Sequence, residues 1–340
     1  MRGVRFMLAQ GEGGGNMIDE ADVVAQGQRI TSIVHRAAFL RELLADMPQE
    51  RMHASEKLED IDRDSDGSLM LHFADGTTHE CDILIGADGI HSTVRKLILG
   101  ETHPAASPRN TGWWCIMALK PYTEAQASLG EDLVDIKDAR EYIWVGDGTS
   151  ILQNVLHGGQ LVQFIIISHD SFEDADLSDH WRRTVSAEEI RTPYRTWPSH
   201  LNKALIDHPA ASTYINGPVC IVGDAAHATT NWQASGGSMS VEDSFILSTL
   251  LGRAESLAQA GTALKVYDRV RRPRTQRMVE SSRGTGTIVT GNGEDTRLDL
   301  EKLREKLLPR WDFIINLDIE KHRDEAVEMM DMELEESTEI

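Results

Sequence analysis

Apolar residues recur at intervals of three and four positions in several parts of the chain. This spacing predicts an amphipathic helix over Arg36–Met47, a second over Val241–Ala258 and a third over Leu264–Arg283. Pro273 stands inside the third segment, and we expect it to kink or split that helix because proline removes a backbone donor. The polar segment 175–212 is also expected to be helical.

Short apolar runs predict strands. Leu69–Phe73 and Cys81–Ile85 are two such runs around a turn. The second run is continuously apolar after its aspartate, which is typical of a strand buried on both faces of a mixed or parallel sheet. Val219–Val222 has the same character.

The middle of the chain has a different pattern. Trp113–Leu119, Glu141–Val145 and Leu161–Ile167 are rich in β-branched and aromatic residues and are separated by glycine-containing turns, which predicts an antiparallel sheet. No strand is expected before the glycine-rich run Gly11–Gly15. The acidic tail from Lys321 is expected to be a solvated helix or a frayed end.

Composition narrows the class of protein. A length of 340 residues suggests about two domains. With 34 Lys and Arg against 55 Asp and Glu, the net charge is −21, which disfavours nucleic acid and membrane surfaces because both are bound through basic residues. Cys81, Cys115 and Cys220 are widely separated, which argues against a disulfide framework or a zinc site. No apolar run is long enough to span a membrane, so we expect a cytoplasmic protein.

The first segment that carries chemistry is Gly86–Arg95. A buried strand is expected to end in Gly-Ala-Asp-Gly, and a helix to start at Ser92. Glycine lets the backbone approach a ligand closely, and a helix N-terminus attracts phosphate. Asp88 can accept hydrogen bonds from ribose hydroxyls or fix the loop. The alternative is a plain strand–turn–helix with Ser92 as its N-cap.

The second segment follows Val219–Val222 and begins Gly-Asp-Ala-Ala-His. Asp224 stands at the carboxyl end of the predicted strand, where open α/β sheets bind ligands. The small residues around it allow an extended ligand to lie against the main chain. The alternatives are an Asx-turn for Asp224 and a hydrogen-bonded loop histidine for His227. We interpret the Glu242–Asp243 pair as acids in the first turn of a helix.

Taken in this order, the two segments resemble the class A flavoprotein aromatic hydroxylases of the p-hydroxybenzoate/salicylate hydroxylase type, above all their fungal members. His35–Leu40 precedes them and Tyr267–Arg274 follows them in the same pattern. The resemblance implies FAD as cofactor, NADH or NADPH as reductant, and O₂ as co-substrate. It further implies transfer of an oxygen atom to an electron-rich aromatic ring, while the protein orients the substrate and excludes water.

The resemblance also implies roles for individual residues. Arg36 would contact the FAD phosphates, Asp224 would bind the ribose, and Gly237 would offer its backbone N–H near the flavin ring. Asp88 and Gly89 would lie in the pocket shared by FAD and the nicotinamide cofactor. No catalytic general base and no metal ligand is assigned.

The chain departs from the family pattern in places. The family opens with a strand and a GxGxxG loop that seats the pyrophosphate, and no strand of this chain leads into such a loop. That first strand is expected beside Val219–Val222. The remaining departures are Asn231 for a proline near the flavin, Ala234 and Ser238 for glycines, Met117 for an arginine that faces the substrate, and Asn154 for a tyrosine.

The expected fold class is α/β, with an incomplete Rossmann-like FAD domain of discontinuous sequence at 1–105 and 215–290 that lacks the N-terminal βαβ unit. A β-rich substrate domain is inserted at 106–214, and a helical C-terminal region with an acidic tail follows at 291–340. The expected function is FAD-dependent, NAD(P)H-using hydroxylation of a phenolic or polyketide-like aromatic small molecule. The alternatives are a non-redox pseudoenzyme, binding protein or cyclase of the same fold, or an inactive fragment of such an enzyme. The oligomeric state is not assigned.

Overall fold

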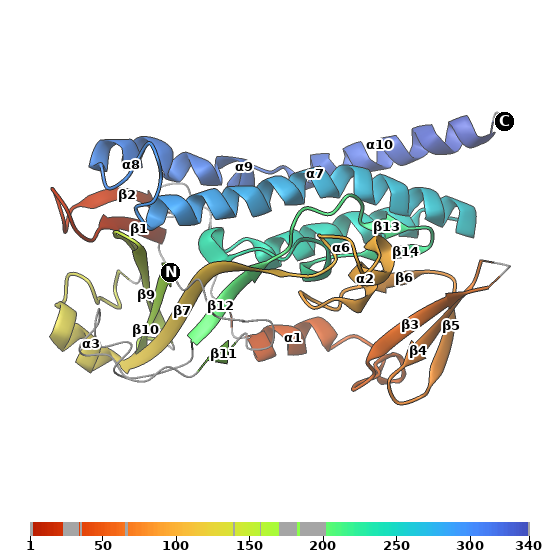
Figure 1. The fold of residues 1–340 in the computed structure, drawn as a ribbon, viewed down its shortest axis with the longest axis horizontal. Helices are drawn as coiled ribbons and strands as arrows, with labels where there is room; N and C mark the ends of the chain where they lie inside the picture. Colours follow the sequence, from red (N-terminus) through yellow and green to blue (C-terminus); the bar gives the residue numbers. More distant parts are fainter. Residues whose placement is uncertain are drawn as a thin grey trace. The chain divides into compact units, whose positions relative to one another are not determined.

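The computed structural model (Figure 1) describes residues 3–22, 34, 36–64, 67–138, 140–156, 158–169, 182–183 and 202–338. The chain forms two compact units, each assembled from separate stretches of sequence. Unit 1 comprises Met1–His35, Asn110–Leu205 and Arg283–Ile315. Unit 2 comprises Arg36–Arg109, Ile206–Ser282 and Asn316–Ile340.

Unit 2 contains a short sheet with the strand order β13-β14-β6. β14 (Val219–Ile221) pairs in parallel with β6 (Leu84–Gly86) and antiparallel with β13 (Ile215–Asn216). All three residues of β14 are buried, as their apolar sequence predicts. Because β14 already has a neighbour on each side, the expectation that the family's first strand belongs beside it is wrong. In the described sheet β6 is an outer strand, which pairs with β14 on one side and has a free edge on the other.

Helices pack around this sheet and form the core of unit 2. They are α2 (Thr93–Leu99), α5 (Asp224–His227), α6 (Gly236–Gly252), the first part of α7 (Leu257–Val289) and α10 (Ile319–Thr338), with the short η2 (Asn231–Gln233) before α6. Ile221, Ile246, Leu264 and Met330 are fully buried members of one hydrophobic cluster. Met330 belongs to α10, which packs on α6, so the acidic tail is a helix with one buried face.

A second, antiparallel sheet of unit 2 is formed by β3 (Leu58–Arg63), β4 (Leu69–Phe73) and β5 (Thr78–Cys81) (Figure 1). Its β4 has the predicted bounds and contributes Leu69 and Leu71 to the core. By contrast, α1 (Arg36–Leu44) and η1 (Gln49–Arg51) contain no buried residue. The apolar positions that predict α1 are therefore largely exposed, among them Phe39 and Leu43.

Unit 1 is built on an eight-stranded sheet with the order β11-β12-β7-β10-β9-β8-β1-β2. The strands are β1 (Gly3–Leu8), β2 (Met17–Asp22), β7 (Arg109–Pro121), β8 (Glu141–Val145), β9 (Thr149–Leu156), β10 (Leu161–His169), β11 (Arg182–Arg183) and β12 (Asn202–Asp207). β7, β10, β9 and β8 are antiparallel neighbours, as the sequence predicts. β1 joins β8 in parallel and β2 antiparallel.

Short helices complete unit 1. They are α3 (Tyr122–Leu129), α8 (Leu300–Lys306), η3 (Leu308–Trp311) and α9 (Asp312–Ile315). α8 lies beside β2 (Figure 1), where Arg304 donates hydrogen bonds to the backbone carbonyls of Met17 and Ile18. These contacts join segments almost 290 residues apart.

The structure groups the ends of the chain differently from the expected domains. No strand is expected before Gly11, yet β1 forms there, and its Phe6 and Leu8 are buried. Since β1 and β2 complete the large sheet, residues 1–35 cluster with unit 1 and not with an FAD domain at 1–105. Residues 316–340 cluster with unit 2, because α10 packs on α6.

Two expected helical features are also wrong. Asn202–Asp207 is a strand, although a helix is expected over 175–212; most of that segment lies outside the described residues. Pro273 does not split α7, which continues unbroken from Leu257 to Val289. Arg271 and Thr275 on either side of it are fully buried, so the packing of this helix compensates for the one backbone hydrogen bond that proline removes.

Candidate cofactor site

The two segments that carry chemistry meet at one edge of the short sheet in unit 2. β6 and β14 run parallel, with Gly86 opposite Ile221. Their carboxyl ends therefore lie side by side, with Asp88 following one strand and Asp224 following the other. This edge is where ligands bind in open α/β sheets.

Gly223 makes the turn that follows β14. Its φ is +58°, a conformation that glycine adopts without strain. A Cβ atom at this position would lie 2.9 Å from the Ser240 Oγ atom of α6. The positive φ thus favours glycine here, and a larger residue would also force the Ser240 hydroxyl to move.

Asp224 begins α5 with an exposed side chain. Within the part of the chain that the structure describes, its carboxylate accepts no hydrogen bond, so an Asx-turn does not account for it. A Cβ built on Gly236 would lie 4.0 Å from its Oδ1 atom, which places the carboxylate near the N-terminus of α6. The carboxylate is available to the hydroxyl groups of a ligand.

The N-terminus of α6 is open to a ligand. The first N–H groups of a helix have no partner inside the helix and attract negative charge. Here they belong to Gly236 and Gly237, and a Cβ on Gly237 would meet no atom within 4 Å. A flavin or phosphate can approach this main chain, so the residues present fit the FAD that the resemblance implies.

Asp88 already has partners in its own loop. Its carboxylate accepts hydrogen bonds from Ser92 Oγ (2.5 Å), Thr93 N (2.7 Å) and Val94 N (3.2 Å). It thereby stabilises the N-terminus of α2, where Ser92 is the N-cap as the sequence predicts. Gly89 follows with a φ of +80°. These contacts favour the loop-fixing role of Asp88; contact of either residue with FAD stays a prediction.

Arg36 is the first residue of α1, and it is exposed. It forms no ion pair or hydrogen bond with any other described residue. The structure therefore does not link Arg36 to the edge of β6 and β14, and its contact with the FAD phosphates also stays a prediction.

Arg95 is a buried residue whose place beside this edge the sequence did not reveal. Its fully buried guanidinium donates to the backbone carbonyls of Ala105 (2.6 Å), Ala226 (2.6 Å), Pro209 (2.9 Å) and Ala225 (3.0 Å). Burial lowers the pKa of Arg95 to about 10. Two of these carbonyls belong to α5, so Arg95 ties the Asp-Gly segment to the Gly-Asp segment.

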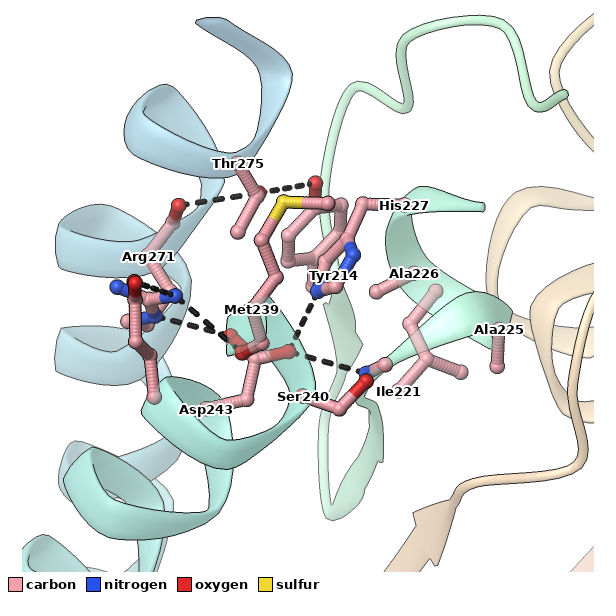
Figure 2. Close-up of polar contacts among 12 residues, drawn as sticks. Tyr214, Ile221, Ala225, Ala226, His227, Met239, Ser240, Asp243, Arg271 and Thr275 are labelled. Atoms are coloured by element: carbon pink, nitrogen blue, oxygen red, sulfur yellow. Dashed lines mark hydrogen bonds and ion pairs between the residues drawn. The ribbon is translucent and has the colours of Figure 1, made fainter. Parts of the chain in front are cut away.

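Asp243 is the second such residue (Figure 2). Its Oδ2 atom lies 2.5 Å from His227 Nε2 and 3.0 Å from the backbone nitrogen of Gly223. Its Oδ1 atom accepts from Arg271 Nε at 2.9 Å. Arg271 also pairs with Glu242 at 2.7 Å. Burial alone would raise the pKa of Asp243, but the His227 hydrogen bond and the charge of Arg271 outweigh it and hold this pKa below its usual value.

The interpretation of Glu242 and Asp243 as first-turn acids is therefore wrong. α6 begins at Gly236, which places both acids in its second turn, where they neutralise a buried arginine. His227 is hydrogen-bonded as expected, through Nε2. Its buried Nδ1 atom has no partner among the described residues. The sequence carries no signal for this role: a buried cation requires a carboxylate nearby, but the burial of Arg271 is known only from the tertiary structure.

The residues that depart from the family pattern lie in both units. In unit 2, Ala234 has a left-handed conformation (φ 51°, ψ 29°), which explains why glycine is usual there. Asn231 and Ser238 are exposed. In unit 1, Met117 pairs with Ile165 across the sheet and accepts a weak hydrogen bond from Gln163.

Asn154 is a buried residue of β9 in unit 1. Its amide nitrogen donates to Glu141 Oε2 at 3.2 Å, and its Oδ1 atom is buried without a partner in the described part of the chain. Burial raises the pKa of Glu141, and the hydrogen bond from Asn154 only partly offsets this. The sheet of unit 1 thus holds a hydrogen-bonded amide and carboxyl group, and the pKa of the carboxyl group is raised.

The described residues contain neither a metal-binding cluster nor a membrane-spanning helix. No group of three or more His, Cys, Asp and Glu residues there is arranged to hold a metal ion. None of the described helices combines the length and the apolar character that crossing a bilayer requires.

Comparison with known proteins identifies the family to which this chain belongs. A family model described as "FAD binding domain" matches residues 38–282, which is more than half of the chain. A 6-methylsalicylate 1-monooxygenase of Aspergillus terreus is 36% identical over 87% of this chain and 68% of its own length. An FAD-dependent monooxygenase of Phaeosphaeria nodorum is 32% identical over 90% of this chain and 65% of its own. The chain thus spans about two thirds of the length of these relatives.

The solved structure of a salicylate hydroxylase substrate complex superimposes with a TM-score of 0.84 and 26% identity, over 95% of this chain and 81% of that one. This likeness confirms the expected α/β fold with an inserted β-rich section and a helical C-terminus. FAD is the cofactor of such proteins, and reduction by NAD(P)H is typical of them. The chain therefore belongs to the family of FAD-dependent aromatic monooxygenases.

Proposed function

We propose that this chain binds FAD and hydroxylates a phenolic small molecule at the expense of NAD(P)H and O₂. The relatives named for salicylate and 6-methylsalicylate support a phenolic ring as the substrate class. The net charge of −21 and three free cysteines support a cytoplasmic setting.

One observation carries the proposal: β6 and β14 bring the Asp-Gly and Gly-Asp turns to the same edge of a sheet, beside the open N-terminus of α6. There Asp224 would bind the FAD ribose, and the N–H of Gly237 would face the flavin. Asp88 and Gly89 would border the same pocket, and Arg36 would contact the phosphates. When bound, FAD supplies the redox chemistry that amino acid side chains lack, including the activation of O₂.

The first test is the visible spectrum of the purified chain before and after addition of FAD. Flavin bands of perturbed shape are expected after the addition. Asp224→Ala should then weaken FAD binding by about 1–3 kcal/mol, or roughly fivefold to 150-fold in Kd, because a ligand hydroxyl loses its acceptor. The side chain is exposed, so the melting temperature of the FAD-free protein should change little.

Oxidation of NAD(P)H by the FAD-bound chain should accelerate when salicylate, 6-methylsalicylate or a neutral phenol is added. The neutral phenol belongs in the panel because Met117 stands where the family usually has an arginine. FAD binding without any substrate-stimulated oxidation across a broad phenol panel would contradict hydroxylation and favour a non-redox binding protein. A chain that leaves the FAD spectrum unchanged would contradict the whole proposal.

A further inference from the structure

A single carboxylate holds both ends of the turn that carries Asp224. Asp243 Oδ2 accepts hydrogen bonds from the backbone of Gly223 and from the side chain of His227, the residues that begin and end this turn (Figure 2). The carboxylate comes from α6, a different element, and is fully buried.

The turn needs such an external contact. α5 has only four residues, far fewer than a helix needs to be stable by itself. Gly223 has a positive φ that a flexible glycine would readily leave. Arg95 holds the carbonyl groups of Ala225 and Ala226 from one side. Asp243 holds the N–H of Gly223 and the imidazole from the other side.

The charge and orientation of Asp243 are themselves fixed. Its Oδ1 atom faces Arg271, which is fully buried and also pairs with Glu242. His322 of α10 faces the same guanidinium, with its Nε2 atom 3.2 Å from Arg271 Nη1. Each oxygen of the Asp243 carboxylate thus has its own partners: Oδ1 accepts from Arg271, and Oδ2 accepts from the turn.

We propose that Asp243 is a positioning residue for the cofactor: it fixes the Gly223–His227 turn in the conformation that presents Asp224 to FAD. This inference rests on the assignment of Asp224 to FAD in the proposed function. Asp243 itself is buried behind the turn and acts through Gly223 and His227.

Asp243→Asn tests the inference, with Glu242→Gln as its matched control. Both variants remove one carboxylate charge next to Arg271 on the same helix. Asparagine presents only one acceptor oxygen, so either the turn or Arg271 then faces an amide N–H. Glu242 pairs with Arg271 and Arg274, and no hydrogen bond or ion pair joins it to the described residues of the turn. Both variants should therefore lower the melting temperature of the FAD-free protein.

FAD affinity should separate the two variants. The Kd for FAD, measured by quenching of flavin fluorescence, should rise about tenfold or more in Asp243→Asn, the range expected for one disrupted buried hydrogen bond. In Glu242→Gln it should rise less than about threefold. In the FAD-free proteins, hydrogen exchange of the amides at 223–227 should be faster in Asp243→Asn than in Glu242→Gln.

Two variants of His227 provide a second test if Asp243→Asn does not fold. The side-chain amide of His227→Gln can still donate a hydrogen bond to Asp243, whereas His227→Leu cannot. The glutamine variant should retain most of the FAD affinity and the leucine variant should lose it. Equal loss in the two variants would overturn the role of this hydrogen bond.

The outcomes distinguish this inference from the proposed function. If Asp224→Ala weakens FAD binding but Asp243→Asn weakens it no more than Glu242→Gln, the positioning role is wrong and the assignment of Asp224 holds. If neither Asp224→Ala nor Asp243→Asn alters the Kd, both are wrong. If Asp224→Ala and Asp243→Asn both weaken FAD binding more than Glu242→Gln does, but no phenol stimulates NAD(P)H oxidation, only the proposed reaction is wrong.

Discussion

Asp88 and Asp224 occupy equivalent places after two parallel strands, but their carboxylates have different surroundings. Asp88 accepts three hydrogen bonds from the first turn of α2. Asp224 accepts none from the described residues and is exposed. The difference depends on Ser92, whose N-cap places two N–H groups and a hydroxyl within reach of Asp88. At the scale of the residue, Asp224 is therefore the better candidate ligand for a cofactor.

Ala234 allows a prediction about backbone strain. It is exposed and adopts a left-handed conformation, which costs a residue with a Cβ atom about 1–2 kcal/mol. Ala234→Gly should therefore stabilise the protein by about 0.5–1 kcal/mol after the greater flexibility of unfolded glycine is included. Urea unfolding measures the change.

The same substitution in a regular helix is the control for Ala234→Gly. Ala258 is exposed in the first turn of α7, so Ala258→Gly should destabilise the protein by about 0.5–1 kcal/mol. If the two substitutions changed stability in the same direction, the left-handed conformation of Ala234 would not be the cause.

At the scale of the element, the N-terminus of α6 has a main chain that is open to a ligand at Gly237. Gly237→Ala adds a Cβ where no atom lies within 4 Å. The FAD-free protein should be as stable as the wild type or slightly more stable, since alanine favours helix. FAD binding should weaken about tenfold or more if the cofactor lies against this backbone, because burying a methyl group in occupied space is costly.

Gly261→Ala is the matched control in α7. A Cβ there also meets no atom within 4 Å, so stability should change as in Gly237→Ala, while the Kd for FAD should not. The melting temperature and the FAD titration report the two effects separately. Unchanged FAD affinity in Gly237→Ala would show that the cofactor does not approach the N-terminus of α6.

At the scale of the whole molecule, the buried His208 makes stability depend on pH. Burial, reinforced by the charge of Arg95, lowers the pKa of His208 from 6.5 to about 4. Between these values the unfolded chain binds a proton that the folded chain does not. Stability is therefore retained above about pH 6.5 and falls as the pH drops towards 4, by about 3 kcal/mol in total.

His208→Gln isolates this effect from the other titrating groups. His322 also has a lowered pKa, owing to burial and to the charge of Arg271. Its effect on the pH dependence of stability is present in both the wild type and His208→Gln, so it cancels in the difference between them. The stability difference between wild type and His208→Gln should thus shift by about 2–3 kcal/mol, in favour of the variant, between pH 7 and pH 4.5. A difference that does not vary with pH would show that His208 titrates normally in the folded protein.

The sequence by itself determined several local elements and the two segments of the site. β4 has its predicted bounds, β14 follows the predicted apolar run, and Asp88 and Asp224 follow strands as expected. These features depend on neighbouring residues, through alternation of apolar positions, glycine turns and N-caps. The same patterns led to the resemblance that the comparisons confirm.

Only the tertiary structure decided which charged groups are buried and which segments are joined. β1 pairs with β8, more than 130 residues away, and Arg95 reaches carbonyl groups on α5 about as far along the chain. Asp243 looks like an ordinary helix acid until Arg271 and His227 are placed around it. The physical reason is that a buried charge is stable only beside a partner. In this protein such partners come from distant elements, whose meeting is set by packing and not by local sequence.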